Sequence, residues 1–184
     1  MLKSGFDAQP RLSNAQFTLT PLQENDRTAL TGAAGDPAIW AGHPARDRHQ
    51  PDRFAPYFDM LLASQATLTF TDTPNGQMIG CSRYYSAPDM PDTVSIGFTF
   101  LTRAYWGGSA NFAIKRMMLD HAFASETAVW FHIDPTNIRS QKATLKLGAT
   151  HEYDASLALV DTPFDWKCYR LSRENWAQTV SART

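Results

Sequence analysis

The chain has 184 residues, 43% of them hydrophobic and 19% charged, which is typical of one well-packed globular domain and not of a disordered chain. Its 17 Lys and Arg nearly balance its 18 Asp and Glu, giving a formal net charge of -1. No basic excess is present to bind the phosphates of a nucleic acid or an anionic membrane surface. We therefore expect neither nucleic acid nor a membrane as a partner.

The cysteine content and the apolar pattern indicate a compartment. No apolar run is long enough to span a bilayer, and residues 1–10 lack the charged-then-apolar pattern of a secretory signal. Cys81 and Cys168 lie far apart, which does not suggest a disulfide framework. We expect reduced thiols in a cytoplasmic protein, organised as a single domain over residues 1–184 with a core at about 17–176 and flexible termini.

The first part of the chain predicts short helices between strands. Alternation over residues 17–22 predicts a half-buried strand that ends near Pro21. Residues 42–53 mix charges of both signs with two prolines, which predicts a solvated loop. Helices are predicted over 26–34 and 54–64, and strands over 66–71, 77–85 and 93–101.

The second part predicts a βαβ unit followed by a helix and two closing strands. A small-residue turn after residue 101 leads into a helix over 110–125, in which Lys115, Arg116 and Asp120 are expected to face water. A strand over 128–134 follows, and this order usually gives parallel strands with a right-handed crossover. The remaining elements are a helix over 137–147 that ends at Gly148 and strands over 155–160 and 166–171.

The turn before the helix at 110–125 is a candidate anion site. A helix N-terminus leaves main-chain N–H groups without intrahelical partners, and its dipole favours negative charge. The small residues at 107–110 would let a pyrophosphate approach those donors. The turn is neither a dinucleotide-binding G-x-G-x-x-G nor a Walker A sequence. Taken alone, it fits a tight turn into a helix as well as an anion site.

Several short motifs in one order resemble the GNAT acetyltransferases, and within them the RimJ/RimL type. The resemblance covers residues 17–176, and each motif is short while their joint order is specific. The motifs are Leu19-Thr20-Pro21-Leu22, Ile79-Gly80, Ile96-Gly97-Phe98-Thr99-Phe100-Leu101, Tyr105-Trp106-Gly107-Gly108-Ser109-Ala110-Asn111, Lys115, Asn137-Ile138-Arg139-Ser140, Lys146-Leu147-Gly148-Ala149, Asp165-Trp166-Lys167-Cys168-Tyr169-Arg170-Leu171 and Trp176.

The resemblance implies an α/β fold, with a mixed, twisted sheet of about six to seven strands flanked by helices on both faces. The two central parallel strands would splay into a V that holds acetyl-CoA as co-substrate. Ser140 would lie near the thioester sulfur as the catalytic residue. The residues that the resemblance assigns to the coenzyme are Phe100, Leu101, Trp106, Gly107, Gly108, Ser109, Ala110, Asn111 and Asn137.

The sequence departs from the family pattern at two serines. Ser109 stands where glycine is commoner in the coenzyme loop, and Ser95 stands where many members carry glutamate. Without that carboxylate, an α-amine acceptor is favoured over lysine, because an α-amine is substantially neutral near pH 7.5. His132 and Asp134 share one strand face and would act on a substrate through water, or simply face solvent. No pair of histidines has metal-ligand spacing, so we expect no metal.

Aromatic residues are the remaining candidates for an acceptor pocket, with Trp40, Tyr84 and Phe98 foremost. The leading interpretation is an N-acetyltransferase that moves an acetyl group directly from acetyl-CoA to a primary amine, on a protein N-terminus or a small molecule. Two alternatives stay open at this point. One is a non-catalytic GNAT-shaped module that binds acyl-CoA or a protein, and the other is a subunit that assembles through its sheet edge. A homodimer is compatible with the sequence.

Overall fold

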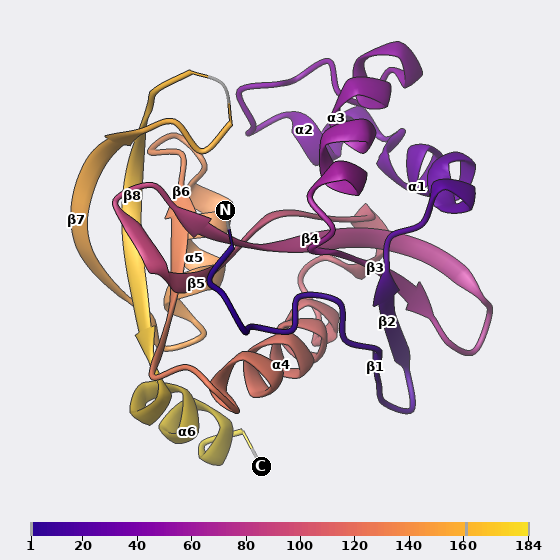
Figure 1. Ribbon diagram of the computed structural model, residues 1–184. Helices are drawn as coiled ribbons and strands as arrows, with labels where there is room; N and C mark the ends of the chain where they lie inside the picture. Colours follow the sequence, from indigo (N-terminus) through magenta and orange to yellow (C-terminus); the bar gives the residue numbers. More distant parts are fainter. Residues whose placement is uncertain (1, 161, 184) are drawn as a thin grey trace. The chain divides into compact units, whose positions relative to one another are not determined.

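The computed structural model describes residues 2–160 and 162–183 (Figure 1). The chain divides into two compact units. The N-terminal unit holds Asp7–Tyr84 and Phe98–Met118, and the C-terminal unit holds Met1–Phe6, Tyr85–Gly97 and Leu119–Thr184. The hydrogen-bonded strands follow the order β1-β2-β3-β4-β5-β6-β8-β7. The described residues form a sheet of eight strands, more than the predicted six to seven, and its flanking helices confirm the predicted α/β fold class.

Antiparallel strands form the sheet of the N-terminal unit. Its strands are β1 (Leu12–Ser13), β2 (Phe17–Pro21), β3 (Thr67–Asp72) and the first part of β4 (Gln77–Ala87). Figure 1 shows α1, α2 and α3 on one side of these strands and α4 on the other. The helices and 3₁₀ turns are η1 (Glu24–Asp26), α1 (Arg27–Ala34), α2 (Pro37–Trp40), α3 (Pro51–Ala63), η2 (Arg103–Tyr105) and the first part of α4 (Ala110–Phe123).

Two helix starts in this unit depend on proline, and that of α2 also has a capping side chain. Asp36 accepts a hydrogen bond from the N–H of Ala38 at 2.9 Å, and Pro37 occupies the first turn of α2, where its missing N–H costs nothing. This short helix was not predicted. Pro51 similarly begins α3 three residues before the predicted start at 54, because its fixed φ suits a first helical turn.

The C-terminal unit contains the parallel strand pair. β5 (Met90–Leu101) runs parallel to β6 (Ala128–Ile133), with Val94 opposite Val129 and Ser95 opposite Trp130. This pairing confirms the predicted βαβ unit. β8 (Phe164–Ser172) is antiparallel to β6 and to β7 (Thr150–Leu157), and the unit's other helices are α5 (Ile138–Leu145) and α6 (Arg173–Ser181).

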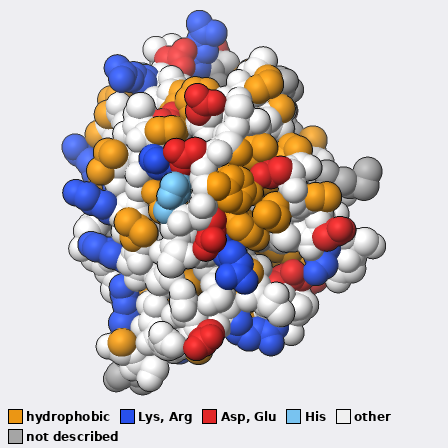
Figure 2. Space-filling model, turned by 90° about the vertical axis from the view of Figure 1, so that its left-hand side faces the viewer, with side chains coloured by type: hydrophobic (Ala, Val, Ile, Leu, Met, Phe, Trp, Pro, Cys, Tyr) orange, Lys and Arg blue, Asp and Glu red, His pale blue; other side chains and the backbone are white. Residues whose placement is uncertain are grey.

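An apolar cluster covers one face of the strands in the C-terminal unit. It consists of the buried Ala87, Trp130, Leu157 and Cys168, with the half-buried Met90, Tyr153, Ala155, Leu159 and Trp166 packed against them. Figure 2 views the molecule from the β7 side and shows hydrophobic side chains gathered there, with acidic side chains at the edges. His132 and Asp134 were predicted to act on a substrate through water or to face solvent. Both are buried instead.

Lys115 is a second correction, because it was predicted to face water on α4. Its side chain is only 6% exposed. The Nζ atom donates to Ser82 Oγ on β4 at 3.0 Å and to Thr99 Oγ1 on β5 at 2.8 Å. Burial lowers the pKa of this ammonium to about 7. Hydrogen bonds to these two hydroxyls therefore allow the polar end of Lys115 to be buried.

Within the part of the chain that the structure describes, no helix combines the length and the apolar character needed to cross a bilayer.

Candidate functional site

The segment before α4 is fixed by side-chain contacts within the N-terminal unit. The Trp106 indole Nε1 donates to the Leu101 carbonyl at 2.7 Å. The Tyr105 hydroxyl donates to the Asp72 carboxylate, and Arg103 pairs with Asp36 at 3.1 Å. Gly107 follows with a φ of +73°, which few other residues adopt readily. These contacts set the direction in which the next main-chain groups point.

Five consecutive N–H groups at this helix start have no protein acceptor. Across the described residues, no hydrogen bond is found for the main-chain N–H of Gly107, Gly108, Ser109, Ala110 or Asn111. A Cβ added at Gly107 or Gly108 would meet nothing within 4 Å, so the glycines stand open. Unpaired amides, an accessible backbone and the helix dipole together suit an oxyanion such as a diphosphate. Ser109 is exposed and keeps its N–H, so its departure from glycine leaves this feature in place.

The end of β5 has an ordered main chain beside the same segment. Phe100 and Leu101 are both buried. The Phe100 carbonyl lies against Gly80, where an added Cβ would be 2.2 Å from its oxygen, and the Thr102 N–H donates to Ile79 O at 2.8 Å. The sequence assigned Phe100 and Leu101 to the pantetheine arm of the coenzyme. The structure places both residues on a segment held against β4, and their role in coenzyme binding stays a prediction.

Asn137 and Ser140 lie at the start of α5 in the C-terminal unit. The Asn137 side-chain oxygen accepts a hydrogen bond from the Ser140 N–H at 3.1 Å and caps the helix. Both residues are half-buried. The Ser140 hydroxyl has no hydrogen-bond partner among the described residues, and is therefore available to a ligand.

The three aromatic residues predicted for an acceptor pocket differ in their surroundings. Tyr84 is fully buried, and its hydroxyl donates to the Met118 carbonyl at 2.9 Å. Trp40 is 2% exposed, and its Nε1 donates to Ala34 O at 2.8 Å. Phe98 is half-buried, with a φ of +53°. Tyr84 and Trp40 are thus core residues, whereas Phe98 keeps open surface.

A hydrogen-bonded pair of Tyr85 and His132 lies in the C-terminal unit. Of the two, the sequence analysis singled out only His132. The Tyr85 hydroxyl is 2.9 Å from His132 Nδ1, and a Cβ at Gly97 would meet the Tyr85 ring at 2.9 Å. The missing side chain at Gly97 thus makes room for this ring. His132 Nε2 and Ser95 Oγ are buried with no partner among the described residues. Burial lowers the pKa of His132 to about 4, so the imidazole is neutral at pH 7.

Metal chemistry has no candidate here, since the described residues contain no group of three or more His, Cys, Asp or Glu that could hold an ion.

An open helix start after a β-strand of a mixed sheet is typical of α/β proteins that bind phosphorylated ligands. The acetyltransferase (GNAT) domain model matches residues 16–150. The chain therefore belongs to the GNAT family, and it is an acyltransferase that depends on acetyl-CoA. A search of curated proteins found no match.

Solved structures share this fold at low sequence identity. A GCN5-related N-acetyltransferase from Brucella melitensis superposes with a TM-score of 0.81 at 12% identity, covering 99% of this chain and 87% of that one. Mycobacterium smegmatis RimJ in complex with CoA-disulfide has a TM-score of 0.69 at 17% identity, covering 100% and 97%. Spermidine N-acetyltransferase from Vibrio cholerae, in complex with CoA and spermine, has a TM-score of 0.63 at 15% identity, covering 89% and 99%.

Proposed function

We propose that this protein transfers an acetyl group directly from acetyl-CoA to a primary amine, either a protein N-terminal α-amine or an amine of a small molecule. We further propose that it is a cytoplasmic enzyme of the RimJ/RimL type. The observation that carries the proposal is the row of unpaired N–H groups at residues 107–111. The fold shared with RimJ and with a polyamine acetyltransferase supports it. Two free, buried cysteines are consistent with a reducing compartment.

The coenzyme would be held mainly by main-chain groups of the N-terminal unit. The amides of Gly107 to Asn111 would bind the diphosphate, and Trp106 would fix the segment through its hydrogen bond to Leu101. Phe100 and Leu101 would pair with the pantetheine arm. Acetyl-CoA would supply the acetyl group as a thioester, from which the thiolate of CoA is a good leaving group.

The acceptor chemistry needs a neutral amine and a place for its proton. An α-amine is already substantially neutral near pH 7.5. Once its nitrogen attacks a carbonyl carbon, its N–H becomes much more acidic, so a weak base suffices to take that proton. The neutral His132, with a buried and unpaired Nε2, suits such a role. Ser140 would stabilise the departing thiolate with a hydrogen bond from its hydroxyl.

A charge placed on the coenzyme loop tests the proposal. Gly108 is the suitable position, because its φ is not in the left-handed region and an added side chain meets nothing within 4 Å. Gly108→Glu should weaken acetyl-CoA binding at least about tenfold in calorimetric titration, since a carboxylate would face the diphosphate. Gly107→Glu is a poorer choice, because the φ of +73° adds backbone strain.

The matched control is Gly108→Gln, which adds similar bulk without charge and should keep most of the affinity. Wild-type protein should also release CoA thiol when acetyl-CoA is mixed with a panel of amines. Equal affinity of the Glu and Gln variants for acetyl-CoA would show that the diphosphate does not bind at this loop. Coenzyme binding without thiol release for any amine would favour the non-catalytic module.

A further inference from the structure

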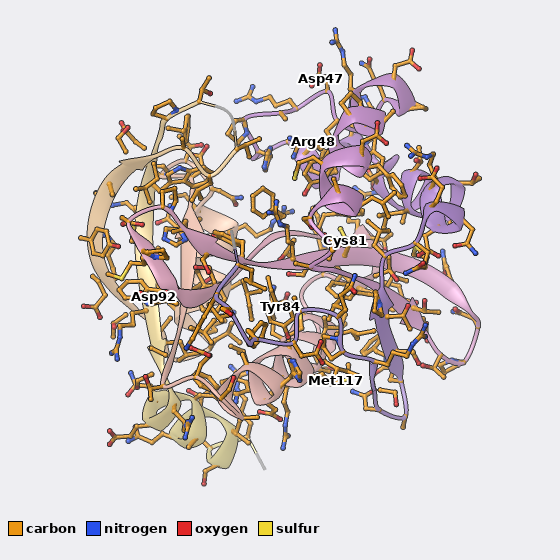
Figure 3. The ribbon with its side chains drawn as sticks, in the orientation of Figure 1. Asp47, Arg48, Cys81, Tyr84, Asp92 and Met117 are labelled. Atoms are coloured by element: carbon orange, nitrogen blue, oxygen red, sulfur yellow. The ribbon has the colours of Figure 1, made fainter. Side chains whose placement is uncertain are left out.

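The segment between α2 and α3 carries an arginine that lies on aromatic rings. The guanidinium carbon of Arg48 is 3.9 Å from the centroid of the Tyr57 ring and 5.2 Å from that of Trp40. Figure 3 shows Arg48 beside Asp47 on this segment, above Cys81 of β4. The side chain is half-buried. The aromatic contacts hold the plane of the guanidinium and leave its N–H edges as the groups that meet a ligand.

Within the described part of the chain, the Arg48 guanidinium forms no ion pair, unlike several other arginines in the same unit. Arg27 pairs with Glu24 and Asp59, and Arg103 pairs with Asp36. The neighbouring Asp47 pairs with Arg53 at 3.3 Å. Among the described residues, no ion pair and no hydrogen-bond acceptor is found for the guanidinium of Arg48, and Asp47 acts on it only through a longer-range coulombic attraction. A half-buried guanidinium without acceptors is costly, because it has lost water and gained no hydrogen bonds in return.

The rings around Arg48 bring a second cation, Arg83, close to it. The Tyr57 hydroxyl donates to the Phe98 carbonyl at 3.2 Å, and the guanidinium carbon of Arg83 lies 4.9 Å from the centroid of the Phe98 ring. Burial raises the pKa of both the Tyr57 hydroxyl and the Cys81 thiol, so neither supplies an anion near pH 7. The cluster of Trp40, Arg48, Tyr57, Arg83 and Phe98 contains two cationic side chains and no carboxylate, which favours an anion over a polyamine.

We infer that Arg48 binds an anionic group of the acceptor, a carboxylate or a phosphate, so that the acceptor is an amine that also carries negative charge. The inference rests on the proposed function and narrows its substrate class. A planar guanidinium fixed by two rings can bind either oxyanion through two parallel N–H donors. Phe98, which the sequence assigned to acceptor binding, belongs to the same cluster. Arg48 was treated there as part of a solvated loop.

Matched acceptor pairs test this inference in steady-state acetylation. Each pair consists of an α-amino acid and its own amide, and a phosphate arm compares O-phosphoethanolamine with ethanolamine. In the wild-type protein the anionic member of a pair should have a kcat/KM at least about tenfold higher. The arm with the larger preference identifies the carboxylate or the phosphate as the preferred group. Equal or reversed preferences in both arms would overturn the inference.

Three variants separate the role of Arg48 from a structural one. Arg48→Gln should abolish the preference mainly by raising KM for the anionic member, while kcat/KM for its neutral partner stays within about twofold. Arg48→Lys keeps the charge but lacks the planar donors, so it should restore part of the preference and serves if the Gln variant does not fold. Arg46→Gln, at an exposed position of the same segment, is the control and should behave like wild type. An equal loss for both members of each pair in Arg48→Gln would contradict the inference.

A measurement without turnover distinguishes this inference from the proposed function. The side-chain Nε–H resonance of Arg48, assigned by its absence from Arg48→Gln, should shift on addition of sodium acetate or sodium phosphate at constant ionic strength against chloride. If no amine is acetylated, the proposed function fails, and this titration alone decides whether Arg48 binds anions. An unshifted resonance in both salts would contradict the anion site.

Discussion

At the scale of single residues, several polar side-chain atoms in this protein lack a hydrogen-bond partner within the described part of the chain. His132 Nε2, Ser95 Oγ and the Ser140 hydroxyl all lack partners among the described residues. Polar atoms left without a partner in a native interior usually meet a ligand or ordered water. In a GNAT enzyme they are the natural candidates for contacts with acceptor and thioester.

The Ser140 hydroxyl gives the first prediction at this scale. Ser140→Ala should lower kcat by about tenfold or more, because one hydrogen bond to developing charge is lost, and should leave acetyl-CoA affinity within about twofold. The Asn137 cap uses the main-chain N–H of residue 140, which alanine retains. Rapid-quench or steady-state rates beside calorimetry make the comparison. An unchanged kcat would remove Ser140 from the chemistry.

The contact between Gly97 and Tyr85 gives the second prediction. Gly97→Ala places a Cβ 2.9 Å from Tyr85 Cε1, so the ring must move and its hydrogen bond to His132 breaks. We expect a loss of about 1–3 kcal/mol in the free energy of unfolding, measured in urea. Tyr85→Phe removes only the hydroxyl and should cost less. Equal stability of Gly97→Ala and wild type would show that the ring has room to spare.

At the scale of elements, the sequence predicts those helices and strands whose formation depends on residues close together in the chain. The strand over 128–134 and the helix over 110–125 were predicted because their apolar periods are regular, and the parallel pairing of β5 with β6 followed from their order. The helix α2 has only four residues and depends on the Asp36 cap, so its apolar pattern is too short to detect. β7 begins at Thr150 and not at 155, since its first residues are mostly polar and exposed.

The site residues also divide into those that the sequence indicates and those that only the folded structure reveals. The glycines at 107 and 108 indicate an open helix start, because residues without a Cβ leave the main-chain N–H groups of a turn accessible. Lys115 and Arg48 gave no such signal, because a cation on an amphipathic helix or in a mixed-charge loop usually faces water. Only the folded chain brings Ser82 and Thr99 to the first and Tyr57 to the second.

The approach of β4 to the end of β5 gives the third prediction. Gly80 has a φ of +153°, and an added Cβ would be 2.2 Å from Phe100 O, which is main chain and cannot rotate away. Gly80→Ala should lower the free energy of unfolding by about 2–4 kcal/mol and weaken acetyl-CoA binding, because Phe100 and Leu101 must shift. Gly32→Ala, in α1 with no atom within 4 Å of the new Cβ, should be neutral or slightly stabilising. Similar melting of both variants would contradict the close contact.

At the scale of the whole molecule, a buried cation makes stability depend on pH. The pKa of Lys115 falls to about 7 in the folded chain, against about 10.4 when unfolded. Between these values Lys115 binds more protons in the unfolded chain than in the folded one, so its contribution to the free energy of unfolding rises with pH over this window. The contribution is complete above the unfolded pKa and is lost as the pH falls through about 7.

Urea denaturation at several pH values between 7 and 10 tests this dependence. The difference in the free energy of unfolding between wild type and Lys115→Met should rise with pH, with a slope of up to about 1.4 kcal/mol per pH unit. The bond between Ser82 Oγ and Thr99 Oγ1, 2.6 Å long, keeps both hydroxyls satisfied in the variant. Lys142→Met, at an exposed position of α5, is the control and should parallel wild type. Parallel curves for Lys115→Met and wild type would mean that Lys115 titrates normally.

The burial of both thiols has a practical consequence for enzymology. Cys81 and Cys168 are free and fully enclosed, and burial raises their pKa to about 12 and about 11, so almost no thiolate is present at neutral pH. Aromatic disulfide dyes used to titrate sulfhydryls should find nothing to react with on the native polypeptide. Such a dye can therefore be present from the start of the reaction, and the increase in absorbance then reports the amount of CoA released.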